Sequence, residues 1–331
     1  PVGLMVPHLS GDDGPRSRLS RCGIHLTRQC AHELLRAGED WQATGVTQLH
    51  PQTGKSAVFH PSAAWVKPAA LVRAWLSQPG IEFCGDSEVA SLEPVPNHGL
   101  DSGAGSDRAW RVLDAHGKTL AQVDHVVFAC AHHTTALWSQ DPAGIFAAGD
   151  HAPPALQGLH GQVSWAHQRP ELNGVLPVQP INGLGSLVAH IPWEGIPSWF
   201  VGATYETLDA APSPVAEQHM QNLDRLRRLL PACAAALEAD FHGEQIQTWS
   251  QTRCVTNDRL PAVGPLLSDI HSGIWINVGM GSRGLSFAAL CAELLASRMD
   301  GGPLPVAATL ARSLDSQRFA KKVRGNYLEK A

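Results

Sequence analysis

The sequence predicts a protein of the mixed α/β (α+β) class, with an α/β domain and a second domain built on an antiparallel sheet. Its 331 residues suggest two domains, at about 150 residues for each. Helix and strand patterns alternate along most of the chain, whereas residues 141–206 carry short strand patterns rich in glycine, proline and tryptophan. Hydrophobic residues make up 44% of the chain, which is enough to fill the cores of both domains.

Four segments have the apolar spacing or the end signals of helices. Within 17–38, apolar residues such as Leu19 and Ile24 recur at roughly helical intervals, and Gly38 suits a C-cap. A proline opens 68–76, at the position where the first turn of a helix tolerates it. The other helices are expected over the amphipathic residues 215–230 and over residues 285–299.

The most apolar strand candidate is His-Val-Val-Phe-Ala-Cys-Ala at 125–131. Such a run is typical of a central strand that is buried on both faces. The other strand candidates are shorter and are bounded by turn residues. They lie at 45–49, 81–84, 88–92, 110–113, 162–165, 198–202 and 274–278.

Composition excludes several classes of protein. A formal net charge of −5 argues against a protein that coats nucleic acid, although a local basic patch remains compatible with it. No apolar run reaches the about 18 residues of a membrane-spanning helix. Seven cysteines without a CxxC pattern favour a reducing, cytoplasmic compartment over a disulfide framework. Without an HExxH or a zinc-ribbon spacing, we expect no metal.

The segment 274–296 has the order strand, glycine loop, helix, and its loop reads GMGSRG. Glycines such as Gly279 and Gly281 allow the backbone to approach a ligand closely. The start of the helix carries a partial positive charge that favours an anion or an electron-rich ring oxygen. From the residues alone, an ordinary strand–helix connection remains the commoner explanation of such a string.

Two other side chains are candidates for ligand contact. Arg253, in TRCVTNDRLPAVG, has the planar guanidinium that suits a carboxylate, although a solvated arginine at a strand end is commoner. Tyr205 is one of two tyrosines, and a tyrosine at a strand end usually packs with its hydroxyl in water. The sequence has no Ser-His-Asp spacing, P-loop or paired carboxylates, so it does not support a hydrolase or a kinase.

Strings along the whole chain resemble those of the D-amino-acid-oxidase-like FAD-dependent oxidoreductases. The resemblance is closer still to the oxidoreductase half of the bifunctional family that makes 5-methylaminomethyl-2-thiouridine in tRNA. The order of the strings, and GSRGL followed by a CAELLAS-type helix, are specific to that family. The strings are PVGLMVPHLSGDDGPRSRL, GVTQLHPQTG, VFHPSAAWVKPAAL, VDHVVFACAH, GQVSW, FVGATYE, TRCVTNDRLPAVG, GMGSRGLSFAALCAELLASRMDGGPLP and LDSQRF.

The resemblance implies a doubly wound FAD-binding domain interleaved with an antiparallel-sheet substrate domain. The family grips the FAD pyrophosphate with an N-terminal strand–GxGxxG–helix unit and carries a methyltransferase half before the oxidoreductase half. Neither is found in this sequence, so we expect a part of a longer protein. The glycine that the family carries within 129–131 is also absent here. The FAD-binding domain is expected over 1–44, 67–140 and 252–331, and the substrate domain over 45–66 and 141–251.

The resemblance also implies roles for single residues. Arg253 and Arg283 match positions that pair with the substrate carboxylate in related amine oxidases, and Tyr205 is a further candidate for that catalytic pocket. The remaining residues are expected to contact FAD. Among them Gly3 passes under the flavin, Val89 meets the adenine, Ala129 and Cys130 end the strand beside the cofactor, and Gly281, Ser282, Arg283, Gly284 and Leu285 line the ribityl chain and isoalloxazine.

The implied reaction oxidises 5-carboxymethylaminomethyl(-2-thio)uridine at the tRNA wobble position to the 5-aminomethyl form and releases glyoxylate. We therefore expect tRNA as the partner and a parent protein that is also a tRNA methyltransferase. Two alternatives stay open: an FAD-dependent oxidase of glycine-like amino acids, and a non-catalytic remnant that has lost FAD. A basic C-terminal cluster weakly favours RNA; its members are Arg312, Arg318, Lys321, Lys322, Arg324 and Lys330.

Overall fold

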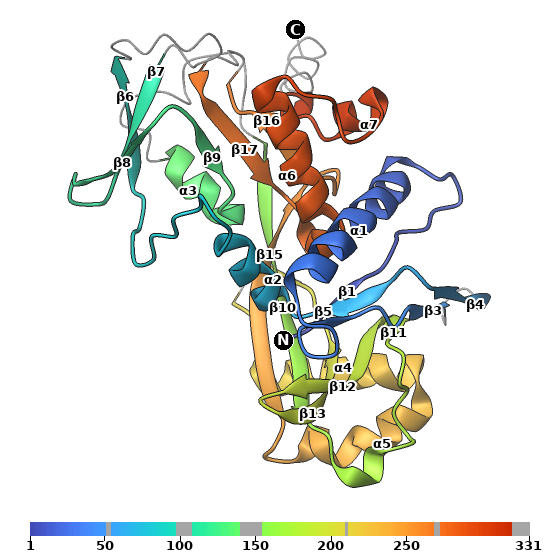
Figure 1. Cartoon of the computed structure of the whole chain (residues 1–331). Coiled ribbons are helices and arrows are strands. Elements are labelled where there is room, and N and C mark those ends of the chain that lie inside the picture. Colours follow the sequence, from blue (N-terminus) through green and yellow to red (C-terminus); the bar gives the residue numbers. More distant parts are fainter. Residues whose placement is uncertain (51–53, 97–107, 140–153, 209–210, 268–271, 320–331) are drawn as a thin grey trace, which may run out of the picture. The chain divides into compact units, whose positions relative to one another are not determined.

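The structure is a computed structural model that describes residues 1–50, 54–96, 108–139, 154–208, 211–267 and 272–319 (Figure 1). By its internal contacts the chain forms two compact units. The first unit comprises Pro1–Ile81 and Gly158–Thr252, and the second unit comprises Glu82–Gln157 and Arg253–Ala331. The contacts thus group residues 1–44 with the first unit, whereas the expected division places them in the FAD-binding domain. That division by ligand remains a prediction.

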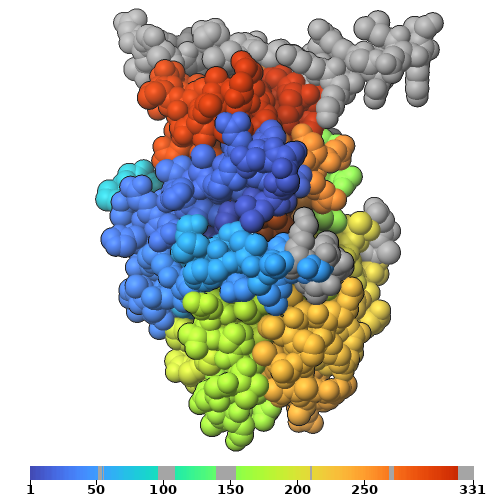
Figure 2. All heavy atoms as spheres, turned by 90° about the vertical axis from the view of Figure 1, so that its right-hand side faces the viewer, coloured from blue at the N-terminus to red at the C-terminus, as the bar shows by residue number. Residues whose placement is uncertain are grey.

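The first unit is built on a large and mostly antiparallel sheet, in which β11 and β3 run parallel to each other. In Figure 2 light-blue atoms, the colour of the segment around β4, lie directly against lime atoms, the colour of the segment around β11. The strands follow the order β14 (Glu206–Thr207), β10 (Leu156–His167), β13 (Ile196–Gly202), β12 (Gly185–Trp193), β11 (Ile181–Gly183), β3 (Val46–His50) and β4 (Lys55–His60), and β15 (Gln247–Thr256) also pairs with β10.

Alternating side chains along β13 give this sheet two apolar faces. Trp199 and Val201 are buried in one core with Leu223 of α4 (Val215–Leu229) and Phe241 of α5 (Pro231–His242). Phe200 lies between them in sequence and belongs to a different cluster. Its ring stacks on that of Trp165, with the centroids 5.8 Å apart. The two helices therefore cover one face of the sheet, and an aromatic cluster lies on the other.

A small antiparallel sheet completes the first unit, in the order β1 (Gly3–Met5), β5 (Ala64–Val66) and β2 (Trp41–Gln42). Trp65 of β5 packs in the same cluster as Phe200. The unit also contains α1 (Pro15–Leu34), which buries Leu19 and Ile24, α2 (Pro68–Leu76), which buries Leu71, and the 3₁₀ turn η2 (Pro170–Leu172).

The second unit holds two three-stranded sheets. In one, β9 (Val126–Phe128) runs parallel to β17 (Ile274–Val278), which is antiparallel to β16 (Ala262–Pro265). The other is an antiparallel meander of β6 (Ser91–Pro96), β7 (Arg108–Leu113) and β8 (Thr119–Val123). Its helical elements within the described residues include the 3₁₀ turns η1 (Ala131–His133) and η4 (Gly281–Arg283), and the helices α3 (Thr134–Ser139), α6 (Gly284–Asp300) and α7 (Ala308–Ser313).

The mixed α/β fold class is confirmed, and α2 and β17 have the predicted bounds. Two predictions about strands are wrong. Residues 81–84 form no strand, and Phe83 there is 69% exposed. The apolar segment 125–131 contains only the short strand β9, which within the described residues ends its sheet and leaves Val127 39% exposed.

Candidate active site

The parallel strands β9 and β17 bring two predicted segments to one edge of the second unit. Phe128, the last residue of β9, pairs with Ile276 of β17. The chain therefore leaves both strands on the same side, at Ala129 and Cys130 in one case and at Gly279 in the other. Ala129 and Cys130 are exposed there. Ligands of α/β sheets bind at such carboxyl ends of parallel strands.

The glycine loop after β17 is held against the end of β15. Gly279 and Gly281 both have positive φ angles, of 81° and 59°. A Cβ atom at Gly279 would lie 2.7 Å from Thr256 Cγ2, and one at Gly281 would lie 3.1 Å from Val255 Cγ1. A bridge between Val255 and Met280 fixes the same approach. Only glycine combines this conformation with this proximity.

The loop leads into the uncapped start of α6. Arg283 is the N-cap residue, no side chain caps the helix, and its first turn contains no acidic residue. Backbone N–H groups and the positive end of the helix dipole therefore remain available to an acceptor. The residues present fit the electron-rich ring edge of a flavin, because the loop is also largely accessible: Ser282 is exposed, and Arg283, Gly284 and Leu285 are half-buried.

Arg253 lies near this loop on β15, two residues before the Val255–Met280 bridge. Arg283 lies three residues after that bridge, and both arginines are half-buried. The structure thus brings the two predicted carboxylate anchors to the edge that also holds Cys130 and the glycine loop. A guanidinium fork at such a position suits a substrate carboxylate.

A buried thiol lies beneath the same loop. Burial raises the pKa of the Cys254 thiol. A hydrogen bond with the Gly279 backbone lowers that pKa, and the charge of the nearby Cys130 raises it further. Because the net direction is upward, Cys254 is a neutral thiol at pH 7. Cys130 is exposed, and its Sγ lies 3.3 Å from Thr134 Oγ1.

The segment after β9 contains a backbone conformation that usually belongs to glycine. Ala131 has a φ of 55°, a region that costs an L-residue about 1–2 kcal/mol. An alanine in place of the expected glycine therefore introduces backbone strain at the candidate site.

The other predicted residues belong to other elements of the chain. Val89 lies just before β6, where the next amide, Ala90 N, donates to Leu113 O of β7. Gly3 in β1 and Tyr205 after β13 belong to the first unit. Their predicted contacts with cofactor and substrate remain predictions.

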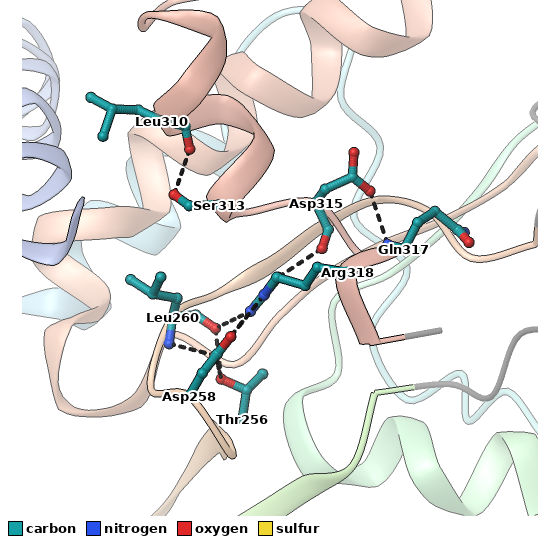
Figure 3. Close-up of polar contacts among 8 residues, drawn as sticks. All are labelled: Thr256, Asp258, Leu260, Leu310, Ser313, Asp315, Gln317 and Arg318. Carbon is teal, nitrogen blue, oxygen red and sulfur yellow. Dashed lines mark hydrogen bonds and ion pairs between the residues drawn. The ribbon is translucent and has the colours of Figure 1, made fainter. Parts of the chain in front are cut away.

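Arg318 has a role that differs from the one expected of it. Its Nε and Nη2 donate to the two carboxylate oxygens of Asp258 at 2.9 and 3.1 Å, and Nη2 also donates to Leu260 O at 2.8 Å (Figure 3). Its side chain is only 15% exposed. Arg318 therefore clamps the turn after β15 and is not a surface residue for RNA. Lys321, Lys322, Arg324 and Lys330 lie outside the described residues.

Asp258 organises the turn that Arg318 clamps. It accepts from Thr256 Oγ1 at 3.0 Å and from Leu260 N at 3.1 Å. Burial by itself would raise the pKa of Asp258, but the hydrogen bond and charge of Arg318 outweigh it, so the pKa is lowered. The sequence alone does not reveal this role of Asp258, because its partner Arg318 is 60 residues away along the chain.

The described parts of the chain contain neither a candidate metal-ion site nor a candidate membrane-spanning helix. Within 1–50, 54–96, 108–139, 154–208, 211–267 and 272–319, no three His, Cys, Asp or Glu residues are grouped so as to hold a metal ion. Among the same residues, no helix has both the length and the apolar character needed to cross a membrane.

Comparisons with known proteins agree with this architecture. The family model described as FAD dependent oxidoreductase matches residues 10–298. Two curated relatives, from Albidiferax ferrireducens and Polaromonas sp., are named tRNA 5-methylaminomethyl-2-thiouridine biosynthesis bifunctional protein MnmC. The Albidiferax protein is 46% identical over 97% of this chain, and the Polaromonas protein is 39% identical over 96% of it. This chain spans about half the length of each relative, 52% of the first and 53% of the second.

Solved structures share the fold. Glycine oxidase from Geobacillus kaustophilus superposes with a TM-score of 0.68 at 17% identity, over 96% of this chain and 87% of that one. Iminodiacetate oxidase from Chelativorans sp. superposes with a TM-score of 0.62 at 16% identity, over 92% of this chain and 86% of the oxidase.

Proposed function

Because the chain belongs to the family of FAD-dependent oxidoreductases, we propose that it oxidises the 5-carboxymethylaminomethyl group of the tRNA wobble uridine, with or without 2-thiolation. The products are the 5-aminomethyl nucleoside and glyoxylate. The observation that carries the proposal is the 46% identity, over 97% of this chain, to a protein named for tRNA 5-methylaminomethyl-2-thiouridine biosynthesis. The relatives' bifunctional name, and the half of their length that this chain spans, support a longer parent protein with a second activity. We propose that this second activity is a tRNA methyltransferase and that the protein works in the cytoplasm.

The residues of the second unit would hold the cofactor. Gly281, Ser282, Arg283, Gly284 and Leu285 would follow the isoalloxazine and ribityl chain, with Ala129 and Cys130 beside them and Val89 at the adenine. FAD, when bound, supplies a hydride acceptor for the carbon between the amine and the carboxylate. The positive end of α6 would stabilise negative charge on a ring oxygen.

The protein's part in the reaction is to bind, orient and exclude water. Arg253 and Arg283 would hold the substrate carboxylate, which places the adjacent C–H bond in a fixed direction. Tyr205 is a further candidate for contact with the substrate. Loss of hydride from this carbon leaves a C=N bond to the nitrogen. Water adds to that bond, the C–N bond breaks, and the nitrogen leaves as the aminomethyl amine while the two-carbon fragment leaves as glyoxylate.

The substrate can be tested with the full-length protein by comparing modified tRNA, the isolated modified nucleoside and free glycine. We expect modified tRNA to have the highest kcat/KM, and that value to fall as salt rises, because phosphate contacts are screened. If free glycine is the better substrate, the tRNA proposal is wrong and an amino-acid oxidase replaces it. If the purified protein shows no flavin absorption band and oxidises none of the three, it is a non-catalytic remnant.

The carboxylate anchor can be tested with Arg253→Lys, which keeps the charge but removes the bidentate fork. We expect turnover of modified tRNA to fall at least tenfold with FAD still bound, since about 1.4 kcal/mol of lost interaction corresponds to a factor of ten. Equal turnover by the variant and the wild type would show that Arg253 is not the anchor.

A further inference from the structure

One face of α4 holds the segment that carries Tyr205. Gln218, Asn222 and Arg225 recur at helical spacing and so lie on the same side of the helix. Gln218 Oε1 accepts from Thr204 Oγ1 at 2.8 Å, and Asn222 Nδ2 donates to Gln162 O at 3.0 Å. Arg225 Nη1 donates to Ala203 O. Three consecutive turns of α4 therefore bind residues 203–204 or the strand beside them.

The backbone between β13 and Tyr205 is fixed by the same network. Thr204 N donates to Gln162 O at 3.1 Å, and Gln162 N donates to Thr204 Oγ1 at 2.8 Å. Thr204, Gln162 and Asn222 are completely buried. Buried polar groups that bind one another in this way favour a single arrangement over alternatives.

Arg225 differs from the other two residues because it reaches beyond the backbone. Its guanidinium carbon lies 5.9 Å from the centroid of the Tyr205 ring. Tyr205 itself is 50% exposed, so apolar packing alone does not determine the direction of its ring. Among the residues that the structure describes, no carboxylate is within ion-pair distance of Arg225. Its guanidinium instead contacts Ala203 O and the tyrosine ring.

We propose that Arg225 is a positioning residue, which fixes the ring of Tyr205 for contact with the substrate. This inference rests on the proposed function, in which Tyr205 contacts the substrate. Arg225 acts through Tyr205 in two ways: it anchors the preceding carbonyl, and its planar cation faces the ring.

Two variants separate these contributions in the full-length protein. Arg225→Lys can still donate to Ala203 O but loses the planar group that faces the ring, and Arg225→Met loses both. Arg227→Met is the matched control, because Arg227 lies on the same helix and pairs instead with Asp224 and Glu238. The ring environment is measured by ¹⁹F NMR of protein labelled with fluorotyrosine, in which the Tyr205 signal is the one that disappears in Tyr205→Phe.

We expect Arg225→Lys and Arg225→Met to shift the Tyr205 signal and Arg227→Met to leave it in place. We expect KM for modified tRNA to rise about two- to fivefold in Arg225→Lys, with kcat nearly unchanged, as an exposed cation–π contact predicts. In a Tyr205→Leu background, Arg225→Lys should have no further effect on KM, because the residue through which it acts is gone.

An unmoved Tyr205 signal in both Arg225 variants, or an equal KM effect with and without the tyrosine, would overturn the proposal. The NMR result does not depend on turnover. A shifted signal in a protein that ignores modified tRNA would refute the proposed function and leave the Arg225–Tyr205 contact intact.

Discussion

The clamp between Arg318 and Asp258 allows a prediction about stability. In Arg318→Met the side chain keeps an unbranched apolar stem but loses the guanidinium, and with it the charge and all the donors. Asp258 then loses both hydrogen bonds from the guanidinium, and Leu260 O and Asp315 O each lose a donor at 2.8 Å. We expect the turn 256–260 and the C-terminal segment to open together more often.

The size of the effect follows from burial. Breaking a fully buried ion pair costs about 3–5 kcal/mol, whereas an exposed pair contributes about 0–1 kcal/mol. The side chains of Arg318 and Asp258 are 15% and 27% exposed, which places this pair between the two limits. We therefore expect a loss of about 2–3 kcal/mol of local stability, which is about a 30- to 150-fold increase in the population of the open state.

Hydrogen exchange measures that opening in the full-length protein. The informative amides are Val263 N, which donates to Leu314 O, and Ser316 N, which donates to Val263 O. Their exchange should accelerate by the stated factor in Arg318→Met and not in the control Arg312→Met, because Arg312 is exposed on α7. An acceleration below about threefold, which corresponds to less than about 0.7 kcal/mol, would refute the argument.

The same clamp has a definite pH dependence. The pKa of Asp258 is lowered in the folded state, so its ionised form stabilises the fold above the unfolded pKa of about 3.9. The folded-state pKa of Asp258 lies below the unfolded pKa, and this contribution is lost as the pH falls from the unfolded pKa through the folded one. The difference between wild type and Arg318→Met should therefore be constant from about pH 7 to 5 and shrink below about pH 4. A difference that vanished between pH 7 and 5 would show that another group is responsible.

Two further predictions concern the candidate site and its partner. Ala131→Gly should stabilise the second unit by about 0.5–1 kcal/mol in thermal unfolding, because glycine adopts a positive φ without strain. The greater conformational entropy of glycine in the unfolded chain offsets part of this stabilisation. Ala129→Gly, whose backbone is not in that region, should not stabilise it, and equal effects of the two variants would remove the explanation. Reversal of Lys321, Lys322 and Arg324 to Glu should raise KM for modified tRNA and leave oxidation of the modified nucleoside unchanged, and equal KM values for tRNA would show that the cluster does not contact RNA.

Local sequence patterns predicted those parts of the fold that depend on local properties. Periodicity and end signals located α2, α4 and β17. In the structure Gly279 and Gly281 approach β15 closely, whereas the predicted approach of this loop to a ligand remains a prediction. The apolar run at 125–131 indicated burial, but hydrophobicity does not report which strands lie beside it, and β9 has one neighbour in the described sheet.

Contacts between distant residues were not predictable in the same way. Arg318 looked like one member of a basic cluster, because its partner Asp258 is 60 residues earlier. The contact of Arg225 with Ala203 O depends on how α4 packs on the sheet. The strain at Ala131 also arises from tertiary structure, since nothing in the residue type predicts a positive φ.

The most direct test of the central claim is a product analysis with the purified full-length protein, FAD and tRNA that carries 5-carboxymethylaminomethyluridine at the wobble position. Nucleosides from the digested tRNA and free glyoxylate are quantified by mass spectrometry over one time course. We predict that the carboxymethylaminomethyl nucleoside disappears as 5-aminomethyluridine and glyoxylate appear in equal amounts, and that Arg253→Lys slows all three changes together. Unchanged tRNA from a preparation that retains flavin and oxidises free glycine would contradict the account.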